Sequence, residues 1–143
     1  MGEIRLKKVA IDEVASNRRR GGDIRVLLSP KTVDATSGFM GVLRLRPGER
    51  VTEHYHPYSE EFIYVVRGSV IVRIDGDQDL KLSPGDGLMV PKEVRHSVRN
   101  TGVLEAFLVF HLSPLAPRPE LGHVDTEPAQ DENAPHVPVG GVP

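Results

Sequence analysis

Short apolar and β-branched runs, closely spaced and separated by turn residues, dominate the first 112 positions of the chain. Runs of this length and alternation are typical of β-strands. Turn signals such as Pro47-Gly48 and Asp75-Gly76 separate them, and no helical period competes. The pattern predicts an all-β sandwich or barrel. Its strands are expected at residues 24–28, 39–45, 51–56, 61–66, 70–74, 80–82, 88–90, 95–99 and 104–112.

The composition changes after Leu112. Residues 113–143 hold seven of the twelve prolines, and proline cannot donate a hydrogen bond to a β-ladder. We therefore divide the chain into a barrel domain with an N-terminal arm at 1–112 and a proline-rich tail at 113–143. Residues 113–119 are expected to pack on the barrel as an extended arm. The composition predicts disorder beyond about Thr126.

Cysteine is absent from the sequence, which excludes disulfides and thiolate metal sites. The 143 residues suffice for one domain with a buried core. A net charge of -2 gives no reason to expect a nucleic-acid or membrane partner. Neither a hydrophobic signal stretch nor an apolar run of membrane length is visible, so we expect a cytoplasmic protein.

Three histidines and one glutamate have the spacing of a metal site. His54 and His56 lie in one predicted strand, where residues two apart point to the same face. Glu61 opens the next strand, and His96 follows 35 residues after it. Imidazoles together with a carboxylate suit a divalent metal such as Zn²⁺, Fe²⁺ or Ni²⁺. We expect the four side chains to converge inside the barrel.

These four residues stand inside two longer spaced signatures, and both signatures resemble the conserved motifs of the cupin superfamily. The resemblance implies a cupin jelly-roll barrel of two antiparallel sheets. The signatures read Gly48-x5-His54-x-His56-x4-Glu61-x6-Gly68 and Gly85-x5-Pro91-x4-His96-x3-Asn100.

The spacing within the first signature also shows which of the adjacent glutamates, Glu60 or Glu61, belongs to the site. Six residues between the carboxylate and Gly68 select Glu61 rather than Glu60, and strand parity then turns Ile63 inward with Glu61. The second signature departs from the cupin pattern once, because Glu93 stands where cupins usually carry glycine. That departure concerns the turn before His96 and leaves the histidine itself in register.

Longer stretches are similar to small single-domain cupins of bacterial aromatic polyketide pathways, above all to polyketide cyclases of the resistomycin and tetracenomycin type. The matching stretches are 17–22, 54–62 and 110–119. The resemblance implies a homodimer, a divalent metal, and a role in folding a poly-β-ketone, free or bound to a carrier protein, into rings. Zn²⁺ is expected first, because such a cyclisation needs no redox chemistry, with Fe²⁺ or Ni²⁺ as alternatives.

His111 is a further ligand candidate. In a jelly roll the last strand runs antiparallel beside the strand that begins at Glu61, and parity with Phe107 and Val109 turns His111 inward. It is then either a metal ligand or a core histidine bonded to the backbone. Ligation by His111 makes a four-imidazole site and frees Glu61 as a catalytic base. Otherwise Glu61 completes the metal shell, and both readings stay open.

Two other polar groups are expected to be less important. The run Arg18-Arg19-Arg20 is interpreted as a solvated loop, and His123 and His136 lie in the tail, away from the predicted site.

The resemblance implies a metal-dependent enzyme that catalyses aldol-type cyclisation and aromatisation of a poly-β-ketone. Metal polarisation of a carbonyl would be combined with removal of an α-proton by Glu61 or a histidine. One alternative is a quercetinase-like oxygenase that uses the same ligands. Another is a non-catalytic accessory subunit of a polyketide synthase complex.

Overall fold

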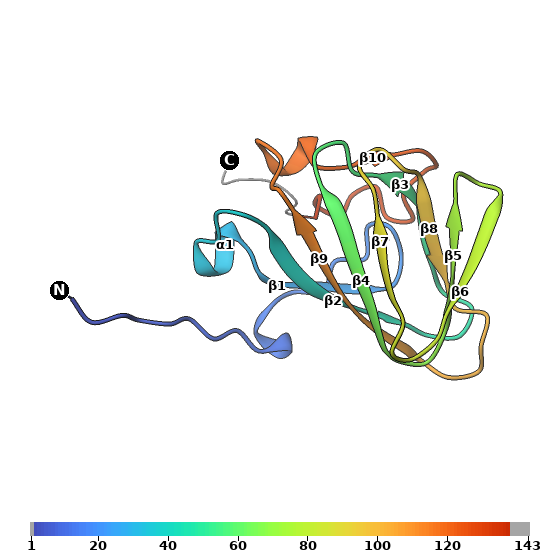
Figure 1. The fold of residues 1–143 in the computed structure, drawn as a ribbon, viewed down its shortest axis with the longest axis horizontal. Coiled ribbons are helices and arrows are strands. Elements are labelled where there is room, and N and C mark those ends of the chain that lie inside the picture. Colours follow the sequence, from blue (N-terminus) through green and yellow to red (C-terminus); the bar gives the residue numbers. More distant parts are fainter. Residues whose placement is uncertain (1, 138–143) are drawn as a thin grey trace.

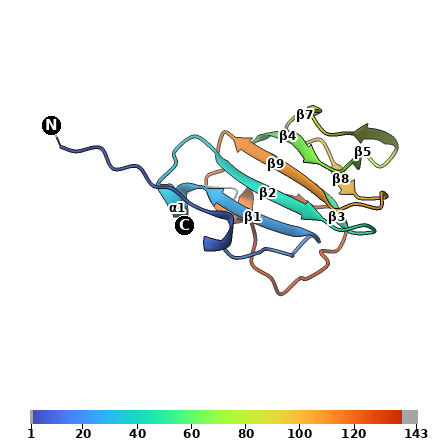
Figure 2. The same ribbon diagram turned by 90° about the horizontal axis from the view of Figure 1, so that it is seen from below.

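A computed structural model describes residues 2–137 of the chain. In this range the protein folds into two five-stranded antiparallel sheets that pack face to face (Figures 1 and 2). The first sheet has the order β1 (Asp23–Leu28), β2 (Phe39–Leu45), β9 (Ala106–Ser113), β4 (Glu60–Arg67) and β7 (Gly87–Val90). The second has the order β10 (Val124–Asp125), β3 (Arg50–Tyr55), β8 (His96–Arg99), β5 (Val70–Ile74) and β6 (Gln78–Leu82).

The nine predicted strands are all present, which confirms the all-β jelly roll. The last of them begins at Ala106 rather than at Leu104. Within residues 2–137, three short helical segments lie outside the sheets: η1 (Ile11–Glu13), α1 (Pro30–Val33) and η2 (Pro119–Leu121). Strand β10 was not predicted, and it belongs to the proline-rich tail.

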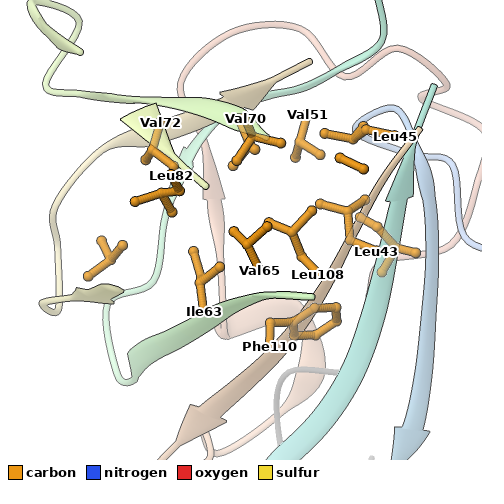
Figure 3. Close-up of a cluster of buried hydrophobic side chains, with 14 of the residues drawn as sticks. Leu43, Leu45, Val51, Ile63, Val65, Val70, Val72, Leu82, Leu108 and Phe110 are labelled. Atoms are coloured by element: carbon orange, nitrogen blue, oxygen red, sulfur yellow. The ribbon is translucent and has the colours of Figure 1, made fainter. Parts of the chain in front are cut away.

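The core fills the space between the sheets, where apolar side chains from both inner faces meet (Figure 3). Strand β9 shows the alternation that a half-buried strand requires. Ala106, Leu108, Phe110 and Leu112 are buried, while the residues between them are partly or fully exposed. Burial of a side chain such as Leu108, which is 1 % exposed, contributes about 1.5–3 kcal/mol. This core fixes the strands whose ends carry the candidate site.

The tail packs against the barrel, in contrast to the disorder expected beyond Thr126. Strand β10 pairs with β3, and Asp125 lies opposite His54 in the register. Arg19 then donates to the carbonyls of Glu132 and Ala134 at 3.1 and 2.9 Å. Val137 is buried in the main core. Composition was misleading because the contacts that order residues 126–137 come from segments more than 70 positions away in sequence. Residues 138–143, also part of that expectation, lie outside the described residues.

Candidate metal centre

Three strands deliver the four predicted side chains to one end of the barrel. His54 lies near the end of β3 and His56 just beyond it, so both point inward from one strand. His96 begins β8 and is the register partner of His54. Glu61 enters from β4, in the opposite sheet. The imidazole centroids of His54 and His96 are 4.5 Å apart, and those of His54 and His56 are 4.9 Å apart.

Each imidazole is oriented by a backbone carbonyl. Nδ1 of His54 contacts the oxygen of Thr52 at 2.8 Å, Nδ1 of His56 that of Gly122 at 3.0 Å, and Nδ1 of His96 that of Val94 at 2.9 Å. A carbonyl oxygen can only accept, so each Nδ1 carries the proton and donates. The three Nε2 atoms are therefore presented to the centre of the site. This arrangement, in which the outer ring nitrogen is held by a carbonyl, is typical of metal-binding histidines.

Glu61 and His96 form a buried charge pair. Nε2 of His96 lies 2.8 Å from Oε1 of Glu61, and Nε2 of His56 lies 3.5 Å from the same oxygen. Burial by itself would lower the His96 pKa, but the bond to Glu61 and its negative charge raise it. Burial would likewise raise the pKa of Glu61, whereas the nearby imidazoles of His56 and His96 hold that pKa well below the ordinary value. Burial, followed by the charges of His96 and His56, lowers the pKa of His54 well below the usual range.

The four residues fit a divalent metal by chemistry and by position. One ligand atom from each of His54, His56, Glu61 and His96 lies within 4.8 Å of the others. Nε2 of His56 is buried and has no hydrogen-bond partner within residues 2–137, and an unpaired buried nitrogen is costly unless a ligand occupies it. Three imidazoles and a carboxylate suit zinc, iron or nickel without selecting among them. Metal binding by these residues stays a prediction.

His111 does not join this cluster, so its expected inward orientation is wrong. It lies on the outer face of β9, is exposed, and is the register partner of Phe62 on β4. Its ring centroid is 6.1 Å from that of Phe62. Parity was counted from Phe107 and Val109, but these residues also face outward, because the buried set is the even-numbered one. The site therefore does not have four imidazoles, and the carboxylate of Glu61 is the fourth potential ligand beside the three histidines.

Glu93 explains why the cupin pattern prefers glycine two residues after Pro91. Its φ of 68° lies in the left-handed region, where glycine carries no Cβ penalty. Its N–H donates to the carbonyl of His56 at 2.9 Å, which links this turn to the ligand strand. The departure in the signature thus leaves the fold intact and places a strained residue beside the site.

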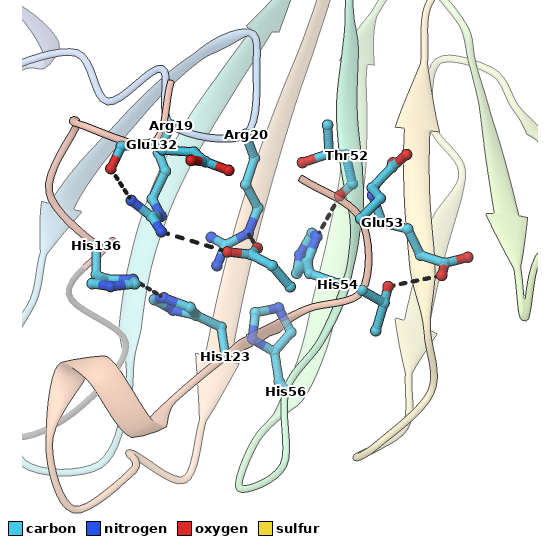
Figure 4. Close-up of polar contacts among 12 residues, drawn as sticks. Arg19, Arg20, Thr52, Glu53, His54, His56, His123, Glu132 and His136 are labelled. Atoms are coloured by element: carbon cyan, nitrogen blue, oxygen red, sulfur yellow. Dashed lines mark hydrogen bonds and ion pairs between the residues drawn. The ribbon is translucent and has the colours of Figure 1, made fainter. Parts of the chain in front are cut away.

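The sequence interpretation missed Arg20, which is not part of a solvated loop. Its side chain is 3 % exposed and lines the same cavity as His54, His56 and Glu61. His123, placed away from the site by the sequence, is also buried and lies beside His56 and Arg20 (Figure 4). Its Nε2 is 2.7 Å from Nδ1 of His136, and burial together with the charge of Arg20 lowers its pKa to about 2. In the sequence, only the run of arginines followed by two glycines could have suggested that Arg20 is buried at the site.

Apart from these polar groups the cavity is apolar. It has a volume of about 60 Å³, enough for a few water molecules. Its remaining lining comes from aliphatic and aromatic side chains of both sheets and from Val137 of the tail. Among residues 2–137, no helix has the length and apolar character needed to cross a membrane.

Two antiparallel sheets with a histidine–carboxylate cluster at one open end define the class of small β-barrel to which the chain belongs. The chain is a member of the cupin family. Residues 41–111 match the family model described as Cupin domain. Protein SchB of Streptomyces halstedii is 62 % identical, over 94 % of this chain and 96 % of its own length.

Two further relatives carry names that mention a polyketide synthase. Polyketide synthase CurC of Streptomyces cyaneus is 58 % identical over 89 % of this chain and 82 % of its own length. Tetracenomycin polyketide synthase protein TcmJ of Streptomyces glaucescens is 49 % identical over 94 % of this chain and 89 % of its own length.

Among solved structures, the oxalate decarboxylase of Bacillus subtilis has a TM-score of 0.73 at 18 % identity. The match covers 88 % of this chain and 33 % of that one, so the likeness concerns the fold.

Proposed function

We propose that the protein is a metal-dependent polyketide cyclase that catalyses aldol-type cyclisation and aromatisation of a poly-β-ketone. The observation that carries the proposal is the buried His54, His56, Glu61 and His96 cluster in an apolar cavity. It is supported by the similarity over nearly the whole chain to proteins named for polyketide synthases. A metal held by His54, His56 and His96 would polarise a carbonyl oxygen as a Lewis acid, with the carboxylate of Glu61 beside it.

The side chains supply the remaining requirements. The apolar lining leaves room for only a few water molecules and would favour one folded conformation of a flexible chain, which lowers the entropic barrier to ring closure. Glu61 is the candidate base for an α-proton. The proton on Nε2 of His96 now holds the Glu61 pKa low, which makes the carboxylate a weak base. Once Nε2 of His96 gives up its proton, Glu61 loses the bond that occupies Oε1, and this oxygen is free to accept an α-proton.

The test combines metal analysis with turnover. We expect purified protein to contain a divalent metal, and His54→Ala and His96→Ala to lose both the metal and cyclisation of a poly-β-ketone made in situ by a polyketide synthase. His111→Ala is the matched control, because this histidine lies on the outer face, and it should keep both. Full cyclisation by a metal-free His54→Ala protein would refute the proposal.

An oxygenase is the second candidate, and one observation favours it. Quercetin 2,3-dioxygenase of Bacillus subtilis is 42 % identical over 52 residues, which is 36 % of this chain and 15 % of that enzyme. The two functions separate under anaerobic conditions. A cyclase keeps its turnover without oxygen, whereas an oxygenase stops and consumes oxygen when it is returned.

We further propose that the chain forms a homodimer and acts on a free or carrier-bound substrate. Exposed apolar side chains on the outer face of β4 and β7 support an interface between copies: Phe62, Tyr64 and Met89 are 43, 50 and 42 % exposed. Sedimentation equilibrium of wild type and Tyr64→Glu tests this. A monomeric wild type contradicts it.

A further inference from the structure

Arg20 presents an unsatisfied cationic donor to the cavity. Its Nε donates to Oδ1 of Asp125 at 2.7 Å, but Nη2 is buried and has no hydrogen-bond partner among residues 2–137. Leaving a charged donor buried and unpaired is destabilising by more than a neutral one. Such a group in a cavity wall indicates a missing ligand. Figure 4 shows the Arg20 side chain directed towards the space beside the imidazoles of His54 and His56.

The backbone holds Arg20 in this position rigidly. Its carbonyl accepts from the N–H of Thr52 at 2.8 Å, two residues before His54. The next two residues, Gly21 and Gly22, have φ values of 98° and 73°. A Cβ on Gly21 would lie 2.1 Å from the carbonyl oxygen of Arg50, so only glycine allows this close approach. Asp125, the partner of Nε, is paired with His54 in the β3–β10 register.

Positive charge exceeds negative charge around Arg20. Asp125 is shared, because Nη2 of Arg19 lies 3.7 Å from its second oxygen while Nε of Arg20 binds the first. Two guanidinium groups thus face one carboxylate. The other buried carboxylate, Glu61, is bound by His96. An anionic oxygen is therefore the complement that this part of the cavity lacks.

We propose that Nη2 of Arg20 binds the enolate oxygen of a β-dicarbonyl unit whose second oxygen is directed to the His54, His56, Glu61 and His96 cluster. The choice of a β-dicarbonyl rests on the proposed function, whereas the anion site rests on Arg20 itself. When Glu61, the proposed base, takes an α-proton, the electron pair of the C–H bond moves into the enolate and the negative charge falls on the two oxygens. Arg20 stabilises this charge where it develops, which is the arrangement that lowers a barrier.

Acetylacetone is the probe, because it is the smallest β-diketone that ionises to such an enolate. Its binding is measured by calorimetry, and its ionisation by ultraviolet absorbance, with zinc-loaded and zinc-free protein. Arg20→Gln should weaken binding roughly 10- to 100-fold in both forms, the loss expected for one charged hydrogen bond. It should also raise the pH at which the bound probe ionises, and leave zinc content unchanged. Arg20→Lys should recover part of the affinity, because it keeps the charge but not the planar fork.

Arg50→Gln is the matched control, since it removes the same charge from a side chain that is 41 % exposed and bound to Glu127; it should bind the probe normally. Wild-type affinity in Arg20→Gln, or loss of zinc together with the probe, overturns the proposal. If Arg20→Gln fails to fold, NMR of the wild-type protein tests the proposal instead. Acetylacetone should shift the guanidinium proton resonances of Arg20. Unchanged resonances with the probe bound would overturn the proposal. Cyclisation is not measured, so failure of the proposed function and failure of this inference are distinguishable.

Discussion

Replacing Glu61 with glutamine tests the charge pair at the centre of the site. Nε2 of His96 donates to Oε1 of Glu61 at 2.8 Å, and the His96 side chain is 1 % exposed. Since Nδ1 of His96 already donates to the carbonyl of Val94, both ring nitrogens carry protons and the pair is an imidazolium facing a carboxylate. Glutamine keeps the shape of Glu61 but removes the charge that raises the His96 pKa.

The expected cost depends on pH. Removing one partner of a buried ion pair costs about 3–5 kcal/mol while the other charge persists. His96 can shed its proton, however, because burial then holds its pKa low, and near neutral pH the cost falls to that of a charged hydrogen bond, about 1.5–3 kcal/mol. In the wild type the raised His96 pKa contributes stability that is fully present below about pH 6.5 and is lost as the pH rises through the folded pKa. Without Glu61 that contribution disappears. Below about pH 6.5 the variant loses a further 1.4 kcal/mol or so per pH unit relative to the wild type.

Urea unfolding of metal-free protein at about pH 6.5 and about pH 5.5 measures this difference. NMR titration of His96 in the folded state measures its pKa directly. Glu60→Gln is the matched control, because it changes the neighbouring carboxylate on the same strand. The reasoning is refuted if Glu61→Gln is destabilised equally at both pH values, or if His96 titrates in the variant as it does in the wild type.

Three further outcomes follow from single features of the structure. Glu93→Gly should raise the free energy of unfolding by about 0.5–1 kcal/mol, because relief of the left-handed φ of 68° exceeds the entropic cost of glycine. The control Glu93→Ala should not raise it, because alanine keeps a Cβ. A Glu93→Gly protein less stable than the wild type in urea would contradict this prediction. The lowered pKa of His123, about 2, contributes stability that is present above about pH 6.5 and lost by about 1.4 kcal/mol per unit as the pH falls below it. His123→Leu should therefore flatten the acid limb of the stability profile of metal-free protein, and an unchanged slope would show that the imidazole is not buried in its neutral form. A chain ending at Glu127 loses the burial of Val137, which contributes about 1.5–3 kcal/mol to stability. It should also bind a hydrophobic dye at the opened cavity. Full stability with no added dye fluorescence would show that the tail does not close the barrel.

The strands and the histidine–carboxylate cluster were predictable because their signals are local. Strand parity needs only neighbouring residues, and it placed His54, His56 and Glu61 on inner faces as the structure has them. Parity failed for His111 because β9 is apolar on both faces. Phe107 and Val109 cover the outside of the sheet while Leu108 and Phe110 fill the core. A strand whose sequence does not alternate between apolar and polar residues gives no reference from which the inward and outward faces can be assigned.

Arg20 could not be placed from the sequence, because its position depends on a distant partner. The ion pair that holds it joins residues 105 positions apart, and the acid, Asp125, lies in the proline-rich tail, just before the stretch expected to be disordered. A run of three arginines is ordinarily a solvated loop. Here the run is drawn inward by two glycines that pack on β2 and β3. The cationic part of the cavity wall is therefore held by residues from both ends of the chain, around a barrel and a histidine–carboxylate cluster that the middle section supplies.

The rigid core strands and the more weakly held tail limit how a substrate could reach the cavity. The cavity of about 60 Å³ matches one small β-dicarbonyl unit better than a whole poly-β-ketone, whose remaining length needs further space. The strands around it belong to the core and cannot move apart without loss of packing. The tail is the part that can yield, because residues 126–137 are held mainly by individual polar bonds such as those of Arg19 and Arg50. The same displacement would remove Val137 from the cavity while leaving Asp125, which is paired in β10, to hold Arg20. If the protein acts on a poly-β-ketone as proposed, we expect the segment beyond Thr126 to move aside for entry while β10 keeps Arg20 in place.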